Sequence, residues 1–133
     1  MSLDQAPVSK GTLWAGRVVT ALPALFLLID GGAKLFKPAP VIEATTQLGY
    51  SENVIVPIGI VLVVCTILYL IPKTSVLGAI LVTGFLGGAV ATHVRAGTGA
   101  FSIVFPVILG SLLWLGLYLR NRSLRLLVPL TSV

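Results

Sequence analysis

The sequence predicts an all-α protein, a four-helix antiparallel bundle that crosses a membrane. Of its 133 residues, 56% are hydrophobic and 10% are charged, and the mean hydropathy is +1.06. A soluble domain carries about 25% charged residues. Four apolar runs are each long enough to cross the hydrocarbon core, because about 20 helical residues cover about 30 Å. The turns at 72–74 and 96–100 are so short that the helices they join must be antiparallel neighbours.

The length and the charge narrow the function classes. Residues 1–133 are enough for a single integral membrane domain and leave no room for a second one. The net charge is +5, but the basic residues are scattered, with no basic run beside aromatic residues. This distribution indicates membrane topology and contact with membrane lipids, and it argues against nucleic acid as a partner. Cys65, the one cysteine, lies in an apolar run and is expected to be a packing residue.

The first predicted span covers residues 12–30, after a polar segment at 1–11 that we expect to be frayed. Arg17 lies near its start, where a long side chain reaches the headgroups, and Pro23 is expected to kink the helix. The glycine pair at 31–32 is expected to end it. A cleaved signal peptide is the alternative, but the segment that follows is not a good cleavage site.

The remaining elements follow in order. The polar stretch 31–53 is the longest loop, and a short interfacial helix is predicted at 40–48, with a proline at its start and a glycine after its end. The second, third and fourth spans are predicted at about 54–71, 75–95 and 101–119.

Four spans place both termini on one side of the membrane. Basic residues are more frequent on the terminal side, which favours a cytoplasmic location for both termini. The first and third spans then both run outward, so Asp30, His93 and Arg95 meet at the outer mouth of the bundle. The acidic residues of the long loop lie at the same face.

Five residues at this mouth are candidate ligand-binding residues: Asp30, Lys34, Tyr50, His93 and Arg95. Ionisable groups at membrane depth are costly and are usually functional or paired. Each residue also has a structural interpretation. Asp30 can mark the end of the helix and pair with Lys34 or Arg95, and His93 can be a hydrogen-bonded interfacial histidine that points about 180° away from Gly84. Arg95 and Tyr50 can be interfacial anchors.

A stripe of small residues in the third span is predicted to pack against another helix. Gly84, Gly87, Gly88 and Ala91 share one face, and small residues allow a helix backbone to approach closely in lipid. Replacing Gly84 or Gly88 with leucine is expected to disrupt folding or assembly. The sequence leaves open whether the partner helix belongs to the same chain or to a second copy.

Motifs for catalysis and metal binding are missing from the sequence. It contains no G-x-S-x-G, no phosphate-binding loop and no C-x-x-C. One histidine and one cysteine at different depths do not make a metal site. The sequence therefore assigns no catalytic residue.

Several stretches together resemble the DoxX-like membrane proteins: GGAKLFKP, QLGY, LYLIPKTSVLGAILVTGFLGGAVATHVRAG and LLWLGLYLRNRSLRLLVPL. The residues that match the family pattern are Lys34, Gly49, Tyr50, Pro72, Thr74, Gly78, Gly84, Gly87, Gly88, His93 and Arg95. The resemblance implies a four-helix transmembrane bundle of bacterial inner membranes. The family name derives from a subunit of a thiosulfate:quinone oxidoreductase, which implies an association with membrane redox processes.

The sequence is compatible with three functions. The leading hypothesis is an accessory or ligand-binding protein that holds a quinone- or lipid-like molecule, or contacts a membrane redox partner, near its outer mouth. The first alternative is a small dimeric proton-coupled transporter, although the predicted position of Asp30 at a helix end opposes it. The second is an enzyme acting on a membrane-dissolved substrate, with Asp30 or His93 as the general acid or base.

Overall fold

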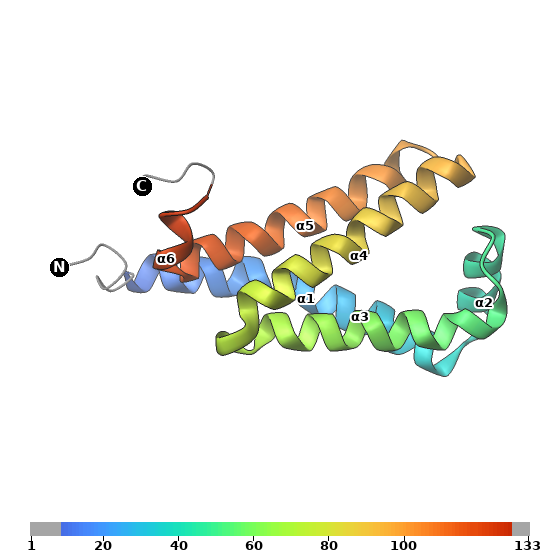
Figure 1. Ribbon diagram of the computed structural model, residues 1–133, viewed down its shortest axis with the longest axis horizontal. Helices are drawn as coiled ribbons and strands as arrows, with labels where there is room; N and C mark the ends of the chain where they lie inside the picture. The colour runs from blue at the N-terminus through green and yellow to red at the C-terminus, as the bar shows by residue number, and fades with distance from the viewer. Residues whose placement is uncertain (1–8, 129–133) are drawn as a thin grey trace.

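The computed structural model describes residues 9–128, and this part of the chain is helical without strands. Four long helices make up the bundle, α1 (Lys10–Phe36), α3 (Ile55–Leu70), α4 (Ser75–Ala96) and α5 (Ala100–Arg120) (Figure 1). The short elements are α2 (Ala39–Gln47), α6 (Arg122–Arg125) and the 3-10 turns η2 (Glu52–Val54) and η3 (Pro72–Thr74). The predicted all-α four-helix bundle is confirmed.

Each long helix packs against two others. The helix α1 contacts α3 and α5, and α4 contacts the same two helices from the opposite side. One end of the molecule holds the start of α1 and α6, and toward the other end α4 and α5 diverge from α1 and α3 (Figure 1). The helix α2 lies at this divergent end. The bundle is therefore tight near the termini and open where α2 lies.

The four long helices are apolar enough to cross a membrane. The apolar segments are Lys10–Phe36, Glu52–Leu70, Pro72–Ala96 and Ala100–Arg120. The last three agree with the predicted spans to within a few residues. The predicted interfacial helix is also present as α2, which follows Pro38 and precedes Gly49 with its positive φ of 96°. Of the predicted frayed segment 1–11, residues 1–8 lie outside the described part of the chain. The prediction was wrong for residues 10 and 11, which belong to α1, with Ser9 capping the helix.

The predicted end of the first span was wrong. The helix α1 continues through Gly31 and ends at Phe36, and Lys37 then adopts a left-handed conformation before Pro38. Gly31 serves helix packing instead, because a Cβ atom there would lie 2.8 Å from Val63 Cγ2 and 3.3 Å from the Gly59 carbonyl oxygen. A glycine inside a membrane helix can thus mark a close contact with a neighbour and not a helix end.

Two further glycine contacts hold the bundle together. A Cβ atom at Gly116 of α5 would lie 2.2 Å from Thr20 Oγ1 and 3.1 Å from the Gly16 carbonyl oxygen of α1. At Gly78 of α4 it would lie 2.1 Å from the backbone nitrogen of Tyr69 in α3. Because no side chain fits at these positions, the helix backbones approach each other directly.

A buried tyrosine joins three helices in the half of the bundle near the termini. The Tyr69 side chain of α3 is fully buried, and its hydroxyl donates to the Leu113 carbonyl of α5 at 2.5 Å. It also lies 3.3 Å from Thr20 Oγ1 of α1 and accepts from Arg120 Nη2 at 3.4 Å. These contacts satisfy a hydroxyl that would otherwise be costly to bury.

Candidate functional site

A cavity of about 550 Å³ lies in the divergent half of the bundle, between α1, α2, α4 and α5. Most of its wall is apolar and comes from the membrane-spanning helices. Phe26 and Leu27 of α1 face Phe105 and Leu109 of α5, and the Phe26 and Phe105 rings meet edge to face at 5.1 Å between centroids. Leu86 of α4 adds to this wall. The divergence of the helix pairs is what leaves this volume unfilled.

Polar side chains line the part of the cavity nearest α2. Four of the five predicted ligand-binding residues are among them: Asp30, Lys34, Tyr50 and His93. The structure thus brings together residues that are up to 63 positions apart in the chain (93 − 30). Thr45 and Thr92 also line the cavity, and the sequence interpretation missed them as candidates. Thr92 continues the four-residue spacing of Gly84 and Gly88, which was the available signal.

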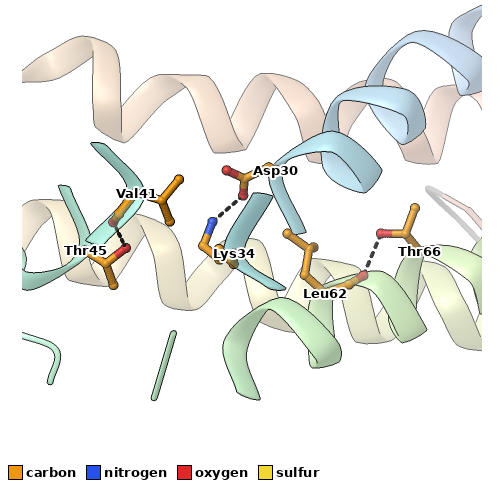
Figure 2. A network of polar contacts seen from close by, with 6 residues as sticks. All are labelled: Asp30, Lys34, Val41, Thr45, Leu62 and Thr66. Atoms are coloured by element: carbon orange, nitrogen blue, oxygen red, sulfur yellow. Dashed lines mark hydrogen bonds and ion pairs between the residues drawn. The ribbon is translucent and has the colours of Figure 1, made fainter. Parts of the chain in front are cut away.

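Asp30 and Lys34 form an ion pair in the cavity wall. Lys34 Nζ donates to Asp30 Oδ2 at 2.7 Å, and Figure 2 shows the two side chains pointing toward each other. The Lys34 side chain is 16% exposed and that of Asp30 is 42% exposed. The pair is an i,i+4 contact that exists only because α1 continues past Gly31.

The ion pair lies deeper than the sequence predicted. Asp30 was expected at the end of its helix, but α1 continues to Phe36. Its neighbour Gly31 packs against Val63, which lies near the middle of the apolar segment Glu52–Leu70. Lys34 packs against Gly59 of the same segment, so the ion pair lies beside residues 59–63 inside the second span, where an unpaired charge is costly.

Two hydrogen bonds join α4 to the segment that follows α2. The hydroxyls of Tyr50 and Thr92 lie 2.7 Å apart, and Arg95 Nη2 donates to the Leu48 carbonyl at 2.8 Å. The Arg95 guanidinium also lies against Gly49, whose Cβ position would be 3.2 Å from Nη2. Arg95 is not part of the cavity wall. It holds the end of α2 over the cavity.

His93 lies at the polar end of the α4 wall. Its Nδ1 is 2.8 Å from Thr98 Oγ1, in the turn that follows α4. The helical wheel separates His93 from Gly84 by about 180°. Both residues nevertheless line the cavity, because the lining residues of α4 cover about half of the helix circumference.

The predicted helix contact of the glycine stripe is not made within the described chain. Nothing lies within 4 Å of a Cβ atom at Gly84, Gly87 or Gly88, and Ala91 is exposed. Gly84 and Gly88 line the cavity instead, so their missing side chains enlarge it. Packing of the stripe against a second copy stays a prediction. Loss of the monomer fold in a Gly84→Leu variant is no longer expected, because leucine would enter open space.

The two ends of the molecule differ in charge over residues 9–128. The end near the termini carries basic residues and no acidic one: Lys10, Arg17, Lys73, Arg120, Arg122 and Arg125. The cavity end carries three acidic and three basic residues: Asp30, Glu43, Glu52, Lys34, Lys37 and Arg95. Two pairs there are in contact, Asp30 with Lys34 and Lys37 with Glu52 at 3.7 Å. The formal charges of these six residues therefore cancel at the cavity end.

Comparison with known proteins identifies the family. The model of the DoxX-like family matches residues 18–116, which is most of the chain and includes α3, α4, the ion pair and the whole cavity wall. Searches of curated proteins and of solved structures gave no match. The four apolar helices and this match agree with each other. The chain is a multi-pass membrane protein that belongs to the DoxX-like family.

Proposed function

We propose that this protein binds a lipid- or quinone-like amphipathic molecule in the cavity between α1, α2, α4 and α5, as an accessory component of membrane redox processes. The observation that carries the proposal is the cavity itself. Its volume of about 550 Å³ lies within the range of about 300–1,000 Å³ that is typical of small-molecule sites. Such sites are mainly apolar with a few convergent polar groups, as this one is.

The lining of the cavity changes from apolar to polar along the bundle axis. Phe26 and Leu27 precede Asp30 and Lys34 on α1, and Gly84 precedes His93 on α4, so both helices run from an apolar to a polar wall. A bound molecule would place its apolar part between α1, α4 and α5 and its polar head beneath α2. This order of polarity matches an amphipath taken from the membrane.

The two alternatives depend on the same residues. The position of Asp30 inside the bundle supports proton-coupled transport, which uses acidic residues within the membrane. The Lys34 ammonium at 2.7 Å opposes it, because it already neutralises this carboxylate. An enzymatic role would need Asp30 or His93 to reach a substrate, and both line the cavity. Neither alternative explains the large apolar wall as directly as binding does.

The charge of the two ends supports an orientation in the membrane. The basic end carries the termini, and basic residues accumulate on the cytoplasmic side of membrane proteins. We therefore place both termini in the cytoplasm and the cavity mouth at the outer face of a bacterial inner membrane. Membrane lipids, a redox partner and a second copy of the chain are the proposed partners.

The test fills the cavity with a side chain. The Gly84→Leu variant places an isobutyl group into the cavity, whereas Gly87→Leu, on the same helix, adds it outside the lining. Each protein is extracted gently from its own membrane and measured by native mass spectrometry. We expect an adduct on the wild type and on Gly87→Leu, and little or none on Gly84→Leu.

The adduct mass identifies the ligand class. Size-exclusion profiles check that both variants remain folded. An equal amount of adduct on all three proteins would place it outside the cavity, and no adduct on any of them would remove the main support for the proposal.

A further inference from the structure

We infer that the cavity selects amphipaths with an uncharged head that both donates and accepts hydrogen bonds, and excludes anionic and cationic heads. This inference rests on the proposed binding function and names the class of ligand. It is carried by the charge balance of the cavity wall and by the contacts of its polar groups.

The charged groups of the cavity wall cancel. Within the described chain, Asp30 and Lys34 are the only carboxylate and ammonium of the wall, and Lys34 Nζ donates a hydrogen bond to Asp30 Oδ2 at 2.7 Å. The remaining polar groups are the hydroxyls of Thr45, Tyr50 and Thr92 and the ring of His93, which is bonded to Thr98. Among the lining residues that the structure describes, both charged side chains thus have a partner of opposite sign.

A charged head would break this balance. An anionic head that bonds Lys34 must compete with the Asp30 carboxylate and is repelled by it. A cationic head that bonds Asp30 must compete with the Lys34 ammonium and is repelled by that group. The apolar wall strengthens these interactions, because charges interact more strongly beside apolar groups than in bulk water. Either head would leave three charges where only two can pair.

An uncharged head has partners at the same place. The Lys34 ammonium has three protons and uses one on Asp30 Oδ2, so it can still donate, and Asp30 Oδ1 can still accept. The Tyr50 and Thr92 hydroxyls are bonded to each other, and each retains capacity as an acceptor or donor. A hydroxyl or carbonyl head thus gains hydrogen bonds without separating the ion pair.

The surroundings of the cavity reinforce this selectivity. The three acidic and three basic residues of this end cancel in net charge, so this end as a whole attracts anions less strongly than the basic end does. The basic end of the molecule, by contrast, attracts anionic lipid headgroups. Anionic lipids are therefore expected at the end near the termini and not in the cavity.

The test compares three probes that share one saturated chain and differ in the head: monolaurin is uncharged, laurate is anionic and dodecylamine is cationic. Unlabelled probes displace radiolabelled monolaurin from purified protein in a scintillation proximity assay at one fixed pH. We expect monolaurin to bind the wild type about tenfold or more tightly than either charged probe.

Single substitutions should invert this order. Asp30→Asn leaves Lys34 as the unpaired charge, so laurate should become the preferred probe, and Lys34→Gln should favour dodecylamine for the opposite reason. The double variant Asp30→Asn/Lys34→Gln restores neutrality and should restore the preference for monolaurin. Glu43→Gln changes the net charge by the same amount as Asp30→Asn on exposed α2, outside the cavity wall, and should leave the order unchanged.

The outcomes separate the two proposals. Suppose that monolaurin binds saturably to the wild type and not to Gly84→Leu, and that laurate or dodecylamine binds the wild type equally well. This result overturns the proposed selectivity and still supports the binding function. Absence of saturable binding for all three probes, together with absence of a native adduct, overturns both. If a single variant does not fold, the wild-type order and the double variant still decide the question.

Discussion

The contact between α3 and α4 at Gly78 predicts that two glycine substitutions in one helix have opposite effects on stability. A Cβ atom at Gly78 would lie 2.1 Å from the Tyr69 nitrogen, 2.4 Å from Tyr69 Cα and 2.6 Å from the Leu68 carbonyl carbon. All three are backbone atoms, so no side chain can rotate away. Gly84, in the same helix, has nothing within 4 Å of its Cβ position. Alanine is therefore tested at both positions.

The magnitudes follow from packing and from helix propensity. Carbon atoms pack at about 3.5–4.0 Å, so Gly78→Ala must push α3 and α4 apart by more than about 1 Å at this point. Overpacking of this kind costs about 1–3 kcal/mol or more, and the change from glycine to alanine in a helix offsets about 0.5–1 kcal/mol of it. For Gly84→Ala only the favourable term of about 0.5–1 kcal/mol remains. We expect the two variants to differ in stability by about 2 kcal/mol.

The assay is reversible unfolding in mixed micelles of a mild detergent and sodium dodecyl sulfate, followed by tryptophan fluorescence. Gly78→Ala should unfold at a lower dodecyl sulfate fraction than the wild type, and Gly84→Ala at an equal or higher one. A Gly78→Ala variant as stable as Gly84→Ala would refute the close backbone contact between α3 and α4.

Two further predictions concern the end near the termini and the orientation in the membrane. Tyr69→Phe removes the hydroxyl that joins α1, α3 and α5 and should cost about 1–2 kcal/mol in the same unfolding assay, whereas Tyr118→Phe, a half-buried tyrosine of α5, should cost less. For orientation, a membrane-impermeant maleimide added to spheroplasts should label Ser51→Cys, between α2 and η2, and not Lys73→Cys in the turn η3, while the buried native Cys65 gives little background. Labelling of Lys73→Cys and not of Ser51→Cys would show that the chain has the opposite orientation in the membrane.

The sequence alone determined the fold class, the three later spans and α2. Long apolar runs, short turns and a proline before a helix are local features, and their physical consequences do not depend on distant residues. The sequence also placed five candidate residues toward one end of the bundle, because helix order and span length decide which ends meet: Asp30, Lys34, Tyr50, His93 and Arg95. Four of these five candidates, Arg95 being the exception, line one cavity.

The tertiary structure decided what each glycine does and where the cavity lies. Gly31, Gly78 and Gly84 look alike in the sequence, yet the first two admit a neighbouring backbone and the third faces open space. Local sequence cannot separate these roles, because each depends on the distance to another helix. The depth of Asp30 followed from the same contact, since packing at Gly31 carries α1 past the expected end and places the ion pair inside the bundle. The cavity exists because α4 and α5 diverge from α1 and α3, and that angle is set by packing between helices and not by any one of them.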